Sequence, residues 1–417
     1  MKIKILLVLL FCMIKVEAQT STFSVADSLF EKGRYRLALE TLDKLEEPSF
    51  LSNYKKALIY ESIDNYKKTA EYLEKALVFK EDYQSKLKLA KAYLRLKKSN
   101  KSVSIYEDIL EIDSLNLILK YQLGKLYLVT KNADKAISIF EYLISKDQLN
   151  AHYSYQLALA FAIKNDRDRM INSFIDTYKK DTLHLKAISR LAISFNKLRD
   201  IDSTKLFVEK GLLINKDDVN LNKLKINQLF REQKYLETIP LLLNLDSISK
   251  KDTYSLSMLG KSYYNLDSLE IAKKYFTKLS FKDREDFKAN TYLGHIAMKE
   301  KKYMSAMMNY TIATRKGKEK RDEEFYGLAM MFYETKKPKQ AIDNFEKAFK
   351  ENYNNYRALF QLAKLSDDYY KEKKIAYKHY VRYLDRFQDR DEVMTAFVKR
   401  RVKEIKKEYF LTEESLD

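Results

Sequence analysis

The residues that most often carry out chemistry in proteins are few in this sequence, and their spacing matches no catalytic motif. The four histidines form neither an HxxxH nor an HExxH pair; they are His152, His184, His295 and His379. Only seven glycines occur among 417 residues, and none belongs to a GxSxG, P-loop or Rossmann pattern. We therefore expect no enzyme, no metal site and no cofactor.

The first residues are typical of a secretory signal peptide. Lys2 and Lys4 precede an apolar run over residues 5–14, and Ala18 supplies a small residue at a cleavage position. The run is shorter than the roughly 20 apolar residues that span a bilayer, and we expect no transmembrane helix in the mature chain. We expect residues 1–18 to be removed and the protein to lie in the periplasm or outer cell envelope. The alternative is an apolar helix that caps the rest of the fold.

The only cysteine, Cys12, lies inside this apolar run. The preceding Leu10 and Phe11 lack the small residue that precedes a lipidated cysteine, so lipidation is not expected. Cleavage after Ala18 would leave no cysteine. Disulfides, thiol catalysis and cysteine-bound zinc are then excluded.

The chain is strongly basic, with a formal net charge of +19. Residues 1–18 contain three lysines and one glutamate, so the mature chain carries +17. Such a charge attracts acidic protein segments, phospholipid head groups, acidic glycans or nucleic acid. Because we expect export, nucleic acid is the least expected of these partners.

Apolar and aromatic residues recur every 34 residues along nearly the whole chain. Three sets show the period: Leu89, Leu123 and Leu157; Tyr93, Tyr127 and Phe161; Tyr106, Phe140 and Phe174. A fixed period in this range indicates stacked copies of one small unit. With only three prolines, seven glycines and 46% hydrophobic residues, the composition favours an ordered, all-helical chain.

One unit, residues 117–150, shows why each copy is expected to form two helices. Steps of three and four residues place Leu123 and Tyr127 on one face of a first helix, and Phe140 on one face of a second. The small Gly124 lets the two helices approach closely. Residues 132–134 supply the turn, and Asp134 is expected to cap the second helix.

This pattern resembles the tetratricopeptide repeat: a Leu-Gly or Leu-Ala pair, an aromatic residue three positions later, then Ala and another aromatic residue. The resemblance covers almost all of the mature chain. Tryptophan and the proline that usually ends each unit are missing, which indicates divergent repeats. In the seventh unit Pro240 lies inside the second helix and is expected to kink or shorten it.

The resemblance implies an all-α, right-handed superhelical solenoid of about eleven repeats over residues 19–390. A charged capping helix is expected at 391–411, followed by a tail at 412–417. The units are expected to start near residues 19, 50, 83, 117, 151, 185, 219, 253, 287, 322 and 356.

In this family the first helix of each unit lines a concave inner surface, where a partner would bind. Tyrosines offer rigid contact area and lysines attract acidic groups, so an acidic protein or peptide is the expected partner. The resemblance places these residues on the inner surface: Tyr54, Lys91, Tyr121, Lys125, Tyr155, Lys223, Asn227, Lys261, Tyr264, Lys288, Tyr326, Tyr333 and Phe360.

Three of these residues, Lys223, Asn227 and Lys288, match positions of the clamp with which some family members hold a C-terminal carboxylate. The other two positions of the clamp hold Met258 and Tyr292. The clamp has an asparagine and a basic residue at these two positions, and loss of the basic residue would weaken charge-assisted recognition of a carboxylate. Chance in a sequence rich in lysine is the preferred explanation.

Lysines and arginines also cluster over residues 371–407, interrupted by Asp and Glu. Such a cluster could dock on an anionic membrane or partner, but a solvated terminal face is the commoner explanation. The leading hypothesis is a non-enzymatic scaffold of the cell envelope that binds a protein in its groove. Alternatives are a basic surface-associated protein that holds anionic lipid or acidic polysaccharide, and the extracytoplasmic part of a signalling or assembly complex.

Overall fold

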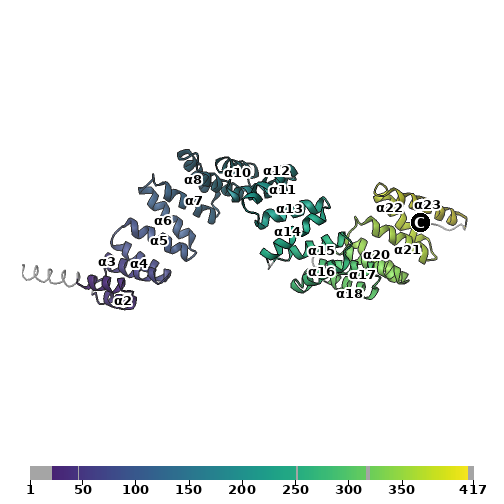
Figure 1. The fold of residues 1–417 in the computed structure, drawn as a ribbon, viewed down its shortest axis with the longest axis horizontal. Helices are drawn as coiled ribbons and strands as arrows, with labels where there is room; N and C mark the ends of the chain where they lie inside the picture. Colours follow the sequence, from purple (N-terminus) through teal and green to yellow (C-terminus); the bar gives the residue numbers. More distant parts are fainter. Residues whose placement is uncertain (1–20, 46, 250–251, 316–319, 412–417) are drawn as a thin grey trace, which may run out of the picture. The chain divides into compact units, whose positions relative to one another are not determined.

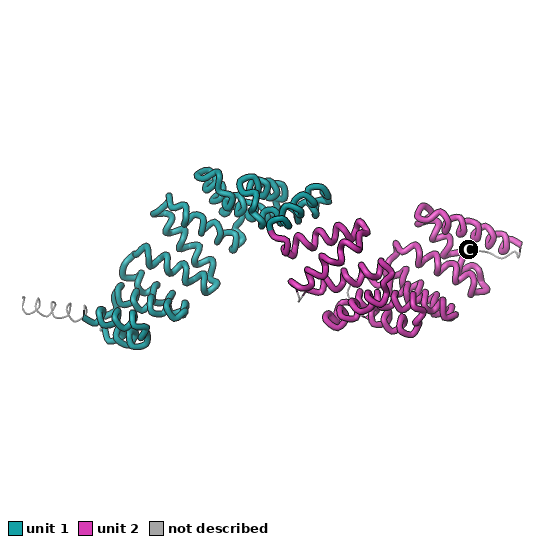
Figure 2. The backbone as a smooth tube through the Cα atoms, viewed as in Figure 1, with its two compact units in different colours: residues 1–214 teal, residues 215–417 magenta. Residues whose placement is uncertain are grey.

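The computed structural model describes residues 21–45, 47–249, 252–315 and 320–411, and every regular element in these ranges is an α-helix (Figure 1). The chain divides into two compact units, residues 1–214 and 215–417 (Figure 2). Within each unit every helix packs against the next one along the chain. The predicted all-α array of stacked helix pairs is confirmed. The expected signal peptide and the tail at 412–417 lie outside the described residues.

Unit 1 begins with a helical segment at residues 21–31. Its other helices are α2 (Tyr35–Asp43), α3 (Phe50–Ser62), α4 (Tyr66–Phe79), α5 (Tyr83–Arg95), α6 (Ser99–Ile112), α7 (Leu117–Val129), α8 (Ala133–Lys146), α9 (Ala151–Ile163), α10 (Arg167–Lys180), α11 (Leu185–Leu198) and α12 (Ile201–Ile214).

Unit 2 continues the series of pairs and ends with an unpaired helix. Its helices are α13 (Val219–Arg231), α14 (Tyr235–Ile248), α15 (Tyr254–Asn265), α16 (Leu269–Lys282), α17 (Phe287–Lys299), α18 (Tyr303–Arg315), α19 (Asp322–Glu334), α20 (Pro338–Glu351), α21 (Tyr356–Tyr369), α22 (Lys374–Phe387) and α23 (Glu392–Leu411). Among the described helices, none is both long and apolar enough to cross a bilayer.

The turn inside a pair has one geometry that recurs along the chain. After α7, Lys131 adopts a left-handed conformation with φ of 60°, and the N–H of Asn132 donates to the carbonyl of Tyr127 at 2.8 Å. This is the Schellman arrangement, which satisfies carbonyls at the end of a helix. The left-handed position is occupied by Gly33, Asp64, Lys97, Lys131, Asn165, Arg199, Gln233, Asp267, Lys301 and Lys336.

Polar side chains start many of the helices. Asn132 accepts a hydrogen bond from the N–H of Lys135 and thereby caps α8, so the expectation that Asp134 caps this helix was wrong. Asp134 lies in the first turn instead, where its carboxylate pairs with Lys164 at 2.6 Å. The charge of Asp134 still favours the helix, because a carboxylate near the N-terminus interacts well with the helix dipole.

The core of a pair forms where a small residue of the first helix meets a large one of the second. A Cβ atom at Gly124 would lie 2.8 Å from the ring of Phe140, and the same distance separates Gly260 from Phe276. Both rings are buried. Because the space beside the small residue is filled by the ring, the two helices can approach closely without leaving a cavity.

Pro240 does not shorten its helix, contrary to expectation. Helix α14 contains 14 residues, as many as α8 or α16, with Pro240 inside it. A proline at this point removes one backbone hydrogen bond, to the carbonyl of Leu236. Both Pro240 and Leu236 are exposed, so water can satisfy that carbonyl at little cost.

Candidate functional site

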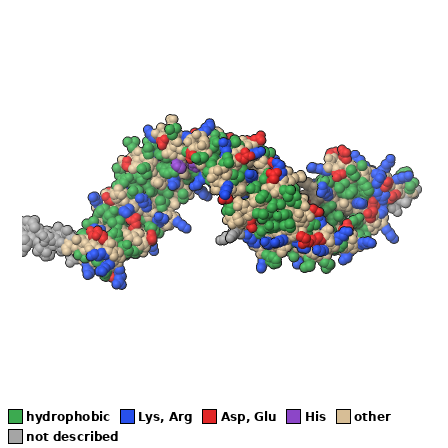
Figure 3. Space-filling view, in the orientation of Figure 1, with side chains coloured by type: hydrophobic (Ala, Val, Ile, Leu, Met, Phe, Trp, Pro, Cys, Tyr) green, Lys and Arg blue, Asp and Glu red, His purple; other side chains and the backbone are tan. Residues whose placement is uncertain are grey.

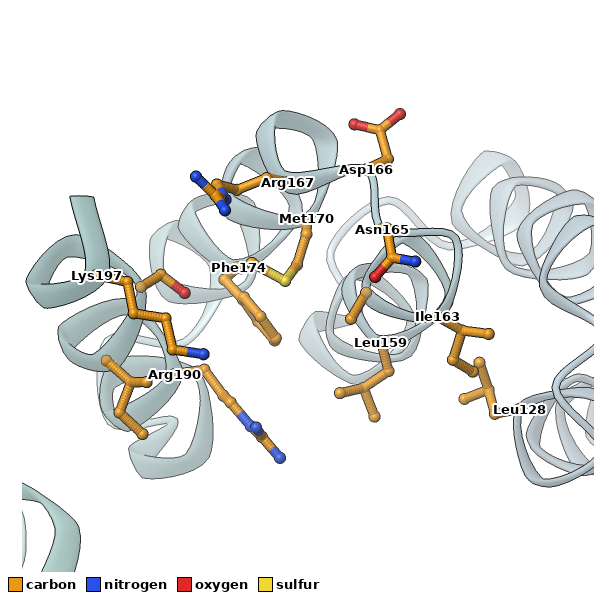
Figure 4. A pocket seen from close by; sticks show the side chains of 13 residues that line it. Leu128, Leu159, Ile163, Asn165, Asp166, Arg167, Met170, Phe174, Arg190 and Lys197 are labelled. Atoms are coloured by element: carbon orange, nitrogen blue, oxygen red, sulfur yellow. The ribbon is translucent and has the colours of Figure 1, made fainter. Parts of the chain in front are cut away.

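A cavity in unit 1 lies among the first helices of three consecutive pairs. It has a volume of about 640 Å³ and is called here the α9–α11 groove (Figure 4). Its lining comes from the end of α7, from α9, from the start of α10 and from α11. The lining residues are Leu128, Leu159, Ala162, Ile163, Asn165, Asp166, Arg167, Met170, Phe174, Arg190, Ile193, Ser194 and Lys197.

Helical spacing explains why these side chains face one groove. On α11 the four lining residues, at positions 190, 193, 194 and 197, follow steps of three and four, which places them on one face. On α9 Leu159, Ala162 and Ile163 follow the same steps. Met170 stands one turn before Phe174 on α10, and the buried Phe174 ring forms the floor. The groove therefore has an apolar interior between two first helices.

The charged residues of the groove are predominantly basic. Asp166 is the one acidic residue of the lining, and its carboxylate accepts from the N–H of Arg169 at 3.1 Å and pairs with the Arg169 guanidinium at 2.6 Å. These bonds lower the pKa of Asp166. Its carboxylate points away from the cavity in Figure 4. Arg190 and Lys197 have no hydrogen bond or ion pair with any described residue.

Of the predicted tyrosines in this part of unit 1, Tyr155 contacts the floor of the groove, whereas Tyr121 packs on Phe140 and Tyr153. The ring of Tyr155 lies 5.6 Å from that of Phe174 and 4.9 Å from that of His184. Lys125 lies over the ring of Tyr121 at 5.6 Å. Tyr155 thus supports the floor of the groove rather than standing free on its surface.

At the start of unit 1 the predicted residues are separated from this groove. Tyr54 stacks on Phe50 with ring centroids 5.7 Å apart. Lys91 is exposed and lines a second cavity, of about 490 Å³, together with Arg95 and Tyr66. The guanidinium of Arg95 lies 5.8 Å from the Tyr66 ring, so part of that cavity is a cation–π contact.

The residues of the hypothetical carboxylate clamp are engaged within unit 2. Lys223 forms an ion pair with Asp252, and the Oδ1 atom of Asn227 accepts a hydrogen bond from the Tyr254 hydroxyl at 2.8 Å. Lys288 lies near the ring of Phe287, at 5.8 Å. An external carboxylate would therefore compete with Asp252 for Lys223, which weakens the clamp hypothesis further.

Lys261 and Tyr264 form part of an aromatic cluster on α15 and α17. Lys261 lies 5.9 Å from the ring of Tyr292, and its pKa is lowered by burial and by the nearby charge of Lys288. Tyr264 makes an edge contact with Tyr292 at 5.4 Å, and the Nζ atom of Lys299 lies 4.7 Å from the centre of the Tyr264 ring. Both tyrosine rings are half-buried in contacts between neighbouring helices, so only part of each ring is open to a partner.

Phe360 was wrongly expected to contact a partner. Its side chain is only 9% exposed, because Phe397 of α23 packs against it at 5.7 Å and Tyr383 at 6.0 Å. The final helix covers the surface that stays open in earlier pairs. Tyr326 is half-buried against Phe345, at 5.4 Å, whereas Tyr333 is 46% exposed.

Part of the basic cluster at residues 371–407 holds the final helix in place. Arg401 of α23 makes two hydrogen bonds to the carboxylate of Asp367 on α21, at 2.6 and 3.1 Å. Lys373 lies 3.5 Å from the same carboxylate, and Tyr380 donates to it at 3.3 Å. Elsewhere Lys and Arg side chains are mixed with Asp and Glu over both units (Figure 3).

The histidines supply no metal site in the described part of the chain. His152 and His184 come close, with ring centroids 5.6 Å apart, but no group of three metal-binding side chains occurs among the described residues. The Nδ1 atom of His184 accepts the N–H of Ala187 and so caps α11. Its other nitrogen then carries the proton, which makes it a poor ligand.

Sequence reasoning missed the cations of the α9–α11 groove. Arg190 and Lys197 belong to the same helix face as Ile193, and this spacing of three and four residues was visible in the sequence. Ile193 and Leu159 looked like ordinary core residues, because a groove wall and a core face share one pattern. What distinguishes them is the empty volume beside them, which no sequence pattern reports.

Comparison with known proteins identifies one of the helix pairs. Residues 83–114, which form α5 and α6, match the family model of the tetratricopeptide repeat. Pairs with the same helix lengths and the same left-handed turn recur through the described residues. Residues 83–114 therefore form a tetratricopeptide repeat, and the other pairs resemble it in helix length and turn geometry. No curated protein matches the chain.

Solved structures with a similar fold share little sequence with this chain. Yeast Tom70 is 14% identical, over 94% of this chain and 96% of that one, with a TM-score of 0.42. The APC/C hetero-tetramer Cut9–Hcn1 is 12% identical, over 91% and 83%, with a TM-score of 0.46. The C-terminal part of a TPR repeat-containing protein from Cytophaga hutchinsonii is 15% identical, over 57% and 99%, with a TM-score of 0.46.

Proposed function

We propose that this protein is a non-catalytic scaffold of the cell envelope that binds a partner protein on the surface of its first helices. The α9–α11 groove in unit 1 is the anchoring site. The observation that carries the proposal is the groove itself, because apolar side chains and unpaired cations line one open cavity. Repeat arrays typically bind partners on such surfaces.

The location in the envelope rests on the signal-like residues 1–18. Cell fractionation and N-terminal sequencing of the mature protein test it. Export predicts a chain that starts at Gln19 and is found outside the cytoplasm. An intact Met1 on a cytoplasmic protein would contradict this part of the proposal and leave the groove unaffected.

Blocking the groove without disturbing the core tests the binding function. Ala162 is exposed at the rim, so Ala162→Trp should fill the cavity from its mouth. Asn172→Trp places the same ring on an exposed position of α10 outside the groove lining and is the matched control. Affinity capture from the native envelope should lose its specific partner with the first variant and keep it with the second.

A basic protein that merely adsorbs to lipid or polysaccharide would behave differently in that experiment. Both variants keep the full net charge, so charge-driven adsorption should survive both substitutions. It should also disappear at high salt, where screening shortens the range of electrostatic attraction. Capture that is unchanged by Ala162→Trp but lost on adding salt would favour that alternative function.

A further inference from the structure

We propose that the α9–α11 groove recognises a peptide segment in which a bulky apolar side chain lies within two residues of a carboxylate. This inference rests on the scaffold function proposed above and specifies the chemistry of its partner. It is carried by three observations: the apolar floor, the unpaired cations of α11 and the unpaired polar groups at the rim.

The floor of the groove accepts an apolar side chain. Phe174 is buried at its base, and the half-buried Leu159, Met170 and Ile193 form its sides. A partner's Leu, Met or Phe inserted there would remove apolar surface from water on both molecules. Met170 adds adaptability, because an unbranched thioether side chain can adjust to ligands of different shape.

The two cations of α11, Arg190 and Lys197, lie on either side of Ile193 along the helix. Arg190 and Lys197 are seven residues apart, which is about 10 Å along a helix, with Ile193 between them. In Figure 4 both side chains extend from α11 beside the cavity. Neither has a carboxylate partner among the described residues, and Asp166 is committed to Arg169. A carboxylate that enters next to an apolar anchor would therefore meet an uncompensated positive charge.

The polar groups of the rim favour a peptide over an acyl chain. The side chains of Asn165 and Ser194 make no hydrogen bond to any described residue. Asn165 occupies the left-handed position of its turn, which holds it outside the helix, with φ of 59°. An amide and a hydroxyl can pair with the N–H and C=O groups of a peptide backbone. A fatty acid offers only its carboxylate and would leave both groups without partners.

A random-peptide display library provides an unbiased probe of the full-length mature chain. The library is selected in parallel on the wild type, on the double variant R190E/K197E, and on K205E. Lys205 is an exposed lysine of α12 outside the groove lining, so its reversal controls for a charge reversal elsewhere on the surface. Binding of the selected peptides is then measured by fluorescence anisotropy at low and high salt, with anionic phospholipid vesicles as a separate ligand.

We expect wild-type selections enriched in Asp or Glu within two residues of Leu, Met or Phe. These peptides should lose at least about tenfold in affinity on R190E/K197E and keep it on K205E, because removal of paired charges weakens close ionic contacts. The double variant should itself select basic peptides. Replacing the acidic residue of a selected peptide by its amide should reproduce the loss on the wild type.

Other results would overturn the inference. Selected peptides without acidic residues, or with equal affinity for R190E/K197E, would show that the cations do not choose the ligand. If such peptides still lose binding on Ala162→Trp, the scaffold function stands and only the proposed chemistry fails. Absence of any selected peptide together with binding of the vesicles would contradict both the inference and the proposed function.

Discussion

Gly294 of α17 lies directly against the ring of Tyr310 of α18: a Cβ atom at residue 294 would lie 2.6 Å from the ring carbon Cε1. Gly327 of α19 approaches the same ring, with its virtual Cβ 2.5 Å from Cζ. The Tyr310 ring is 1% exposed and therefore has no room to move aside. One aromatic residue of a second helix thus fills the space left by glycines of two successive first helices.

This packing predicts that Gly294→Ala destabilises unit 2 although alanine is the better helix former. Overpacking costs about 1–3 kcal/mol, and the gain in helix propensity offsets up to about 1 kcal/mol. We expect a net loss of about 1–2 kcal/mol in urea unfolding followed by circular dichroism.

A compensating substitution distinguishes overpacking from a general effect on the helix. In the irregular seventh pair, Ile226 of α13 and Leu242 of α14 share one core cluster, at positions where other pairs combine a small residue with an aromatic one. Tyr310→Leu should therefore make Gly294→Ala less costly, or even favourable. Additive effects of the two substitutions in a double-mutant cycle would contradict the close-packing account.

The stability of unit 2 should depend on pH through His295. Burial lowers the pKa of this histidine to about 4 from an ordinary value of 6.5, and its Nδ1 atom lies 2.7 Å from the Tyr310 hydroxyl. Since the folded-state pKa is the lower one, the stabilisation is complete above about pH 6.5 and is lost as the pH falls towards 4. The full loss corresponds to about 3 kcal/mol.

Urea unfolding of the wild type and of His295→Gln at neutral and acidic pH checks this dependence. The free energy of unfolding should depend less steeply on pH in the variant than in the wild type. Part of the dependence should persist, because burial also lowers the pKa of His184 and His379. His152→Gln changes an exposed histidine that contacts His184, and it should alter the pH dependence less than His295→Gln does. An equal change in the free energy of unfolding with pH for all three proteins would show that His295 does not cause the pH dependence.

The contact between Asp367 and Arg401 should decide whether α23 stays docked. Asp367 has a side-chain exposure of 7%, so removal of Arg401 leaves a buried carboxylate with Lys373 as its remaining basic partner. We expect Arg401→Met to cost about 2–3 kcal/mol, below the range for a buried charge left alone. Hydrogen exchange should accelerate in α23. Arg400→Met, which alters an exposed pair with Glu404, is the matched control and should leave this exchange unchanged.

Glycine at a left-handed turn position should stabilise a repeat. Lys131 has φ of 60°, a conformation that costs a residue with a Cβ atom about 1–2 kcal/mol. Lys131→Gly should raise stability by a net of about 0.5–1 kcal/mol, because glycine loses more chain entropy on folding. Lys135→Gly, inside α8, should instead lower it by about 1 kcal/mol. A loss of stability from Lys131→Gly in thermal unfolding would contradict the assigned turn.

The architecture could be predicted because its causes recur. Pairs such as Gly124 and Phe140 repeat at the same spacing, so each copy reports the same contact and the sequence period reveals it. Pro240 misled the prediction of local structure, since a kinked or shortened helix was expected and α14 keeps 14 residues. The cap of α8 was also misplaced, because Asn132 and Asp134 are both good capping residues and their order in the turn decides between them.

The candidate site was less predictable because its determinants do not recur. Phe360 resembles Tyr121 and Tyr155 in repeat position, but α23 covers it. Lys223 was expected to face a partner, and Asp252, in the loop between α14 and α15, already forms an ion pair with it. Such contacts depend on which neighbour a side chain meets, and the repeat pattern carries no information about that neighbour.

Site-specific photocrosslinking in the native envelope tests the central claim most directly. A photoreactive residue at Ile193 would sit in the α9–α11 groove, whereas one at Leu206 would sit on the exposed side of α12. The account predicts one partner protein crosslinked from position 193, absent from position 206 and lost when R190E/K197E is added. Crosslinks of equal yield from both positions, or a partner that survives the charge reversal, would contradict a binding site in this groove.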